Sequence, residues 1–79
     1  MKVVNEPVKL MAIFNTNGTI EPVKFVIKDK VVRIEQILKV YEEHFVGNTR
    51  IVFVCQHKGS YIYEIKYEIA SNTWFFFKK

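Results

Sequence analysis

Apolar residues dominate three segments in the last third of the chain, and short turn segments separate them. The apolar segments are residues 50–57, 60–69 and 73–78, and the turn segments are Lys58-Gly59 and Ser71-Asn72. Such an arrangement is typical of strands joined by tight turns. The pattern predicts a three-stranded antiparallel meander.

A hairpin is predicted near the start of the chain, where Asn17-Gly18 lies between two apolar segments. Both central residues of a two-residue type I′ turn need positive φ, which Asn and Gly tolerate best. The resulting register pairs Ala12 with Val23, Leu10 with Phe25 and Val8 with Ile27, and all six side chains share one face. A short extended piece at residues 31–33 follows.

Residues 34–45 show a different spacing. Their apolar members recur every three or four positions, as in one stripe of an amphipathic helix: Ile34, Ile37, Leu38, Tyr41 and Phe45. Gly47-Asn48 is a typical helix end, although no good N-cap residue stands directly ahead of the segment. The expected fold is α+β: an antiparallel sheet of about five strands, made of the hairpin, one helix and the meander, in one domain spanning residues 1–79.

The meander is expected to have one nearly apolar face, which would seat the helix. In the predicted register Val52 lies opposite Ile65 and Val54 opposite Tyr63. One helix cannot cover both faces of the sheet. The second face therefore requires either a sheet that curls toward a half-barrel or a partner that covers it.

Size and composition favour one small folded domain. The 79 residues are 49% hydrophobic, with three Gly and two Pro. A core this small is often reinforced by oligomerisation, so a homodimer is expected. The single cysteine, Cys55, allows no internal disulfide, and no targeting or membrane-spanning segment is visible, so a cytoplasmic protein is expected.

The charge is unevenly distributed. The net charge is +4, with six Lys/Arg against three acids in residues 1–33, and Glu35, Glu42 and Glu43 against Lys39 in residues 34–45. The basic strands are compatible with attraction to polyanions, and plain solubility is the alternative explanation.

No catalytic or metal-binding pattern is present. Cys55 and His57 fall on one strand, but zinc needs three or four ligands and only His44 could join them. No Gly-rich phosphate loop or hydrolase motif occurs. We expect no enzymatic activity, no cofactor and no small-molecule substrate.

The second face of the sheet is the candidate binding surface, because it combines cations with flat rings. Cations can follow phosphates while rings stack on bases, so single-stranded nucleic acid is one expected partner. A second copy of the chain is the other. The candidate residues are Lys24, Phe53, Lys66, Phe75 and Phe77.

The sequence from Pro22 onward, PVKFVIKDKVVRIEQILKVY and later GSYIYEIKYEIASNTWFFFKK, resembles a small uncharacterised bacterial domain family. The family pattern has a Pro-led strand, a tight turn, a helix with a V/I-L core ending in an aromatic residue, and a closing YEI/L…W strand. Many members have Trp where this chain has Tyr41. Some members are encoded beside, or fused to, translesion-type DNA polymerases. The resemblance implies a non-enzymatic, DNA-associated accessory role.

Overall fold

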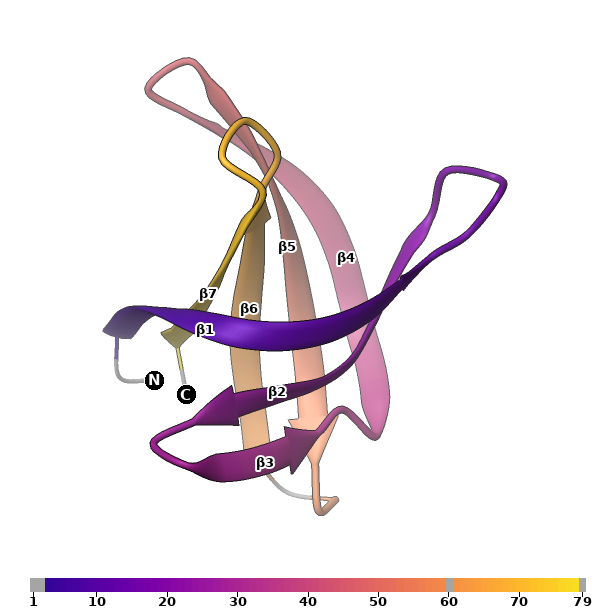
Figure 1. Ribbon diagram of the computed structural model, residues 1–79, viewed down its shortest axis with the longest axis vertical. Coiled ribbons are helices and arrows are strands. Elements are labelled where there is room, and N and C mark those ends of the chain that lie inside the picture. The colour runs from indigo at the N-terminus through magenta and orange to yellow at the C-terminus, as the bar shows by residue number, and fades with distance from the viewer. Residues whose placement is uncertain (1–2, 60, 79) are drawn as a thin grey trace.

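Every regular element in the described residues, 3–59 and 61–78, is a β-strand in the computed structural model (Figure 1). The expected α+β fold is therefore wrong, and the fold is all-β. One antiparallel sheet has the strand order β3-β2-β1-β7-β6-β5-β4. The seven strands are β1 (Val3–Phe14), β2 (Ile20–Ile27), β3 (Lys30–Arg33), β4 (Gln36–Phe45), β5 (Asn48–His57), β6 (Tyr61–Glu68) and β7 (Thr73–Lys78).

The sheet curls into a half-barrel, with β1–β3 running across β4–β6 (Figure 1). The bend between β3 and β4 joins its two ends. The amide of Ile34 donates to the carbonyl of Val23 on β2 at 2.9 Å, and the amide of Glu35 donates to the carbonyl of Gln56 on β5 at 3.3 Å. Two consecutive residues are thus bonded to β2 and β5, the strands next to the two opposite ends of the order, and these bonds bridge the curl on that side.

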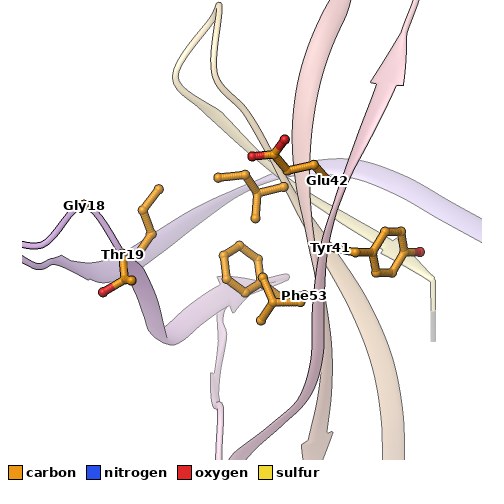
Figure 2. Close-up of a pocket in the computed structure, with 8 residues that line it drawn as sticks. Gly18, Thr19, Tyr41, Glu42 and Phe53 are labelled. Atoms are coloured by element: carbon orange, nitrogen blue, oxygen red, sulfur yellow. The ribbon is translucent and has the colours of Figure 1, made fainter.

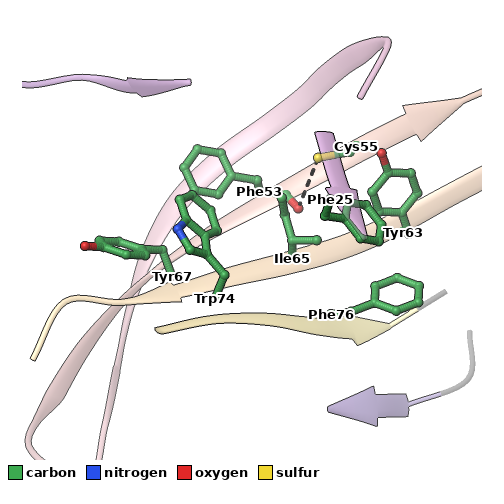
Figure 3. Close-up of a cluster of buried hydrophobic side chains, with 8 residues drawn as sticks. All are labelled: Phe25, Phe53, Cys55, Tyr63, Ile65, Tyr67, Trp74 and Phe76. Atoms are coloured by element: carbon green, nitrogen blue, oxygen red, sulfur yellow. Dashed lines mark hydrogen bonds between the residues drawn. The ribbon is translucent and has the colours of Figure 1, made fainter. Parts of the chain in front are cut away.

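The core fills the concave side of the curl and is largely aromatic (Figure 3). Phe25 comes from β2 and is 1% exposed. Its ring centroid lies 5.5 Å from that of Tyr63 and 5.3 Å from that of Phe76, so it ties β2 to β6 and β7. A second group is formed by Trp74 with Phe53 at 5.7 Å and with Tyr67 at 4.6 Å. Edge-to-face and tilted ring pairs of this kind add to the stabilisation from buried area.

The helix predicted over residues 34–45 is wrong, because this segment forms β4 and pairs with β5 from Gln36–Gln56 to Phe45–Asn48. A bulge at Leu38 adds one residue to the strand. Ile37 and Val40 consequently both pair with core residues of β5 despite their spacing of three. A period of two with one inserted residue imitates the spacing of a helix over so short a segment.

The helix end predicted at Gly47 is also a hairpin turn. Val46 has φ 49° and Gly47 has φ 79°, which are the two positive values that a two-residue type I′ turn requires. A glycine with positive φ ends helices and closes hairpins equally well, so the residue alone does not distinguish them.

The predicted register between β5 and β6 is wrong by one residue. Phe53 lies opposite Ile65, and Cys55 lies opposite Tyr63. The predicted connection was the two residues Lys58-Gly59, whereas the observed pairing ends at His57 opposite Tyr61, so one more residue separates β5 from β6. That residue, Ser60, was predicted to begin a strand and lies outside the described residues. A slip of one residue exchanges the faces of a strand, so Phe53 and Cys55 enter the core.

The first hairpin also has a different turn. Asn15 and Thr19 are joined by a backbone hydrogen bond of 2.9 Å around a three-residue loop, and only Gly18 in that loop has positive φ. A bulge near Val23 then adds a residue to β2, so Ala12 pairs with Pro22. The two irregularities offset each other, and the predicted pair of Leu10 with Phe25 is confirmed.

Candidate nucleic-acid interface

The five residues predicted to form a binding surface are not all together. Lys66, Phe75 and Phe77 share the convex side of β6 and β7, where Lys66 pairs directly with Phe75. Phe53 is 1% exposed in the core on the concave side. Lys24 is on β2, which β1 separates from β7.

Lys66 is buried, and its ammonium group contacts both a carboxylate and an aromatic ring. It is 6% exposed, its Nζ lies 2.7 Å from Oε2 of Glu43, and the same Nζ lies 3.5 Å from the ring centroid of Phe77. The side chain crosses β5, where Val52 is 0% exposed. The lysine stem can therefore cover apolar surface while the ammonium binds a carboxylate. Lys66 cannot bind phosphate while it holds Glu43.

Arg50 makes a parallel arrangement one row away. Its Nη2 lies 2.8 Å from Oε2 of Glu68, its Nε donates to the same oxygen at 2.9 Å, and its guanidinium carbon is 5.4 Å from the ring centroid of Phe75. Lys78 approaches the ring of Phe77 at 5.5 Å. Cations thus lie against both rings that were predicted to stack on bases. We call this surface the ion-paired face; it comprises Glu43, Arg50, Lys66, Glu68, Phe75 and Phe77.

A second cationic surface lies on the convex side of β1, β2 and β3. Two cross-strand rows make it: Met11–Lys24–Arg33 and Lys9–Val26–Val31. Among the described residues, no carboxylate lies within ion-pair distance of these three cations. We call it the β1–β3 face; it comprises Lys9, Met11, Lys24, Val26, Val31 and Arg33.

The apolar members of the β1–β3 face are open to solvent. Met11 is 56% exposed, Val31 is 60% exposed, and Val26 is 37% exposed. A shallow depression of about 190 Å³ is lined by Lys9, Leu10, Met11, Lys24 and Val26. Sequence reasoning selected Lys24 on this hairpin but overlooked the exposed apolar residues beside it. The register that pairs Leu10 with Phe25 already implies that Met11 and Val26 point the other way.

Two of the pockets on the concave side adjoin the aromatic core. One, of about 450 Å³, lies between the tip of the first hairpin and β4; Figure 2 shows Glu42 and Phe53 beside it and Tyr41 projecting away. The other, of about 270 Å³, is almost entirely apolar and lies between β2–β3 and the β5–β6 end of the sheet. Tyr63 lines it, and in the described part of the chain its buried hydroxyl has no hydrogen-bond partner.

The Cys55 and His57 pair offers no reactive or metal-binding geometry. Burial raises the pKa of the Cys55 thiol to about 12, so it stays protonated near neutral pH. Nδ1 of His57 donates to the carbonyl of Arg33 at 2.9 Å. Within residues 3–59 and 61–78, no group of three or more His, Cys, Asp or Glu side chains could hold a metal ion. The described part of the chain also has no helix of the length and hydrophobicity needed to cross a membrane.

Comparisons with protein-family models, curated proteins and solved structures return no match. The resemblance to the polymerase-associated family therefore stays a prediction, and the functional case depends on the surfaces themselves.

Proposed function

We propose that the protein is a non-enzymatic DNA-binding module that contacts DNA through the β1–β3 face. One observation carries the proposal: three cations without acid partners among the described residues alternate with exposed apolar side chains on a three-stranded sheet. Unpaired Lys and Arg can displace the counterions of the phosphate backbone, which is the main source of affinity in DNA binding. The ion-paired face lacks this capacity because Lys66 and Arg50 already hold carboxylates.

Duplex DNA fits this surface better than a single strand. Single-strand binding depends on aromatic rings that stack on bases, and the β1–β3 face contains none. Phe75 and Phe77, the rings predicted for stacking, are contacted by Arg50, Lys66 and Lys78. Proteins that bind the minor groove combine Lys or Arg with apolar side chains that press against base steps. Met11, at 56% exposure between Lys9 and Lys24, is suited to that role.

Fluorescence anisotropy with a labelled duplex and with one of its strands tests the proposal. We expect micromolar binding of the duplex at about 50 mM salt, weaker binding of the single strand, and loss of most affinity by about 200 mM. Lys24→Ala and Arg33→Ala should each weaken duplex binding several-fold and reduce the salt slope by about one. Met11→Glu should abolish binding without unfolding the protein.

Lys58→Ala is the matched control, because Lys58 is an exposed lysine in the turn between β5 and β6. It should bind the duplex as the wild type does. No duplex binding at low salt would contradict the proposed function. An equal loss in Lys58→Ala would show that net charge alone is responsible, and tighter binding of the single strand would overturn the choice of duplex.

The proposal includes a cytoplasmic location, which the lone buried thiol favours, and an accessory role of the kind that the family resemblance implies. A homodimer remains a separate proposal. The open edge of β4 offers a better surface for it than Phe75 and Phe77, because cations of the same chain already contact both rings.

A further inference from the structure

β4 is a long strand at the end of the sheet. Within the described residues it pairs only with β5 and has ten residues, whereas the strand at the other end, β3, has four. Three of its large side chains are well exposed: Leu38 at 45%, Val40 at 53% and Tyr41 at 37%. An edge strand presents unpaired N–H and C=O groups that can bind another strand. β4 is the longer of the two edges that the described sheet leaves open.

The bulge at Leu38 restricts regular pairing to the residues that follow it. From Lys39 to Phe45 each residue of β4 has one partner on β5, without interruption. Within this stretch Lys39, Tyr41 and Glu43 share the convex side, and Val40 and Glu42 share the concave side. A strand that adds to β4 must match this alternation.

A second copy of β4 can match it only in certain registers. Two identical antiparallel strands related by a two-fold axis keep their convex sides together only when one residue lies opposite its own copy. The centres that pair at least three residues of each copy within the regular stretch are Val40, Tyr41, Glu42, Glu43 and His44.

Charge selects one of these centres. A centre at Glu42 or Glu43 places two carboxylates directly opposite each other, which is destabilising. A centre at Val40 or at His44 forms no ion pair, because Lys39 then lies opposite Tyr41 of the second copy or outside the paired residues. A centre at Tyr41 places Lys39 opposite Glu43 of the second copy, twice by symmetry, on either side of a tyrosine pair.

We propose that two copies of the chain associate through antiparallel pairing of their β4 strands, with Tyr41 opposite Tyr41 of the second copy. Lys39 lies on the same side of β4 as Tyr41, with its Nζ 5.2 Å from the ring centroid of that tyrosine. The Glu43 side chain holds Lys66 but keeps 29% exposure, so its carboxylate is accessible to a second ammonium. On the concave side, Val40 would lie beside Glu42 of the second copy.

This surface shares no residue with the β1–β3 face, so the dimer and the DNA proposal can fail separately. Light scattering at sub-millimolar concentration should give twice the 9.4 kDa mass of the chain. Lys39→Glu should give monomers, because it places two carboxylates opposite each other at both ends of the seam. Lys58→Glu, a reversal of the same sign in an exposed turn, should leave the dimer intact.

Disulfide trapping tests the register. Tyr41→Cys should form a covalent dimer under mild oxidation, whereas Lys39→Cys should not, because its copy would lie four positions along the partner strand. Cys55 is buried and should not interfere. A monomer at every concentration, or a dimer that Lys39→Glu leaves intact, would overturn the proposal. Cross-linking by Lys39→Cys without cross-linking by Tyr41→Cys would overturn the register.

Discussion

The ion-paired face and the β1–β3 face lie on the convex side of the same sheet and use cations in opposite ways. On the former, Lys66 and Arg50 each hold a carboxylate within 2.8 Å and lie against a phenylalanine ring. On the latter, Lys24 and its neighbours have no acid partner among the described residues. The difference indicates that cations on one face stabilise the fold and cations on the other are available to a ligand.

The largest effect expected from this comparison is on stability. Lys66→Ala should lower the free energy of unfolding by about 3 kcal/mol, because it leaves the half-buried carboxylate of Glu43 without its partner. Lys24→Ala, at an unpaired position, should change it by less than about 0.5 kcal/mol. Urea unfolding of both variants measures the difference. Equal losses would show that the two faces do not differ in this way.

The second effect concerns stability at alkaline pH. β5 and β6, which carry part of the ion-paired face, also carry two buried acidic groups on their core side. Burial raises the pKa of Cys55 to about 12 and raises that of Tyr63 above its usual value of 10. The unfolded state releases these two protons at a lower pH than the folded state does. Their contribution to stability is therefore complete below about pH 9 and is lost as the pH rises. We expect a loss of about 2 kcal/mol between about pH 9 and 10.5.

Denaturant titrations over this pH range check the slope. Cys55→Ala combined with Tyr63→Phe should flatten it, because neither replacement can ionise. Lys9→Ala, on the β1–β3 face, should keep the wild-type slope. A slope unchanged in the double variant would mean that other groups cause the alkaline loss.

Replacing the Lys66–Glu43 pair as a whole should cost much less than breaking it. The double variant Lys66→Met with Glu43→Gln leaves no buried charge and keeps similar volumes, so we expect a loss below about 1 kcal/mol. Comparison of this double variant with the single variants Lys66→Ala and Glu43→Gln separates two free energies: the cost of an unpaired carboxylate and the stabilisation that the ion pair provides. A double variant as unstable as Lys66→Ala would contradict this interpretation.

The smallest expected effect concerns two connections: the turn between β4 and β5 and the loop between β1 and β2. The β4–β5 turn places Val46 at φ 49°, an unfavourable conformation for a β-branched residue, whereas the loop between β1 and β2 uses Gly18 at its positive φ. Val46→Asn should stabilise the protein by about 0.5 kcal/mol, which a melting curve can detect. Val31→Asn, at a valine that is also exposed (60% against 84% for Val46) but lies in a regular strand, should give no gain.

The strands of the meander followed from the sequence because turn residues separate its apolar segments. The placement of Tyr63 and Ile65 on the apolar side of the meander is correct, since both lie in the core. The errors came from single inserted residues, namely the bulge at Leu38 and the third residue of the β5–β6 turn. Local propensity does not encode such insertions strongly, because they depend on the partner strand.

The candidate surface was affected by the same errors. A one-residue slip placed Phe53 on the convex side in the prediction, although it lies in the core. The partners of Lys66 were unpredictable for another reason: Glu43 was assigned to a helix, so its approach across β5 could not be foreseen. Charges on a strand can be assigned to ligands only after their neighbours are known.

The pairing of β1 with β7 has a consequence for how the chain acquires its structure. These strands come from opposite ends of the described chain, yet they are neighbours in the interior of the sheet, with Val8 opposite Trp74. During synthesis, residues 3–33 can form only a three-stranded ribbon, and its junction with the remaining strands must wait until Thr73–Lys78 leaves the ribosome. Contacts this distant in sequence slow folding, and the nascent chain exposes the edge of β1 until the last strand arrives.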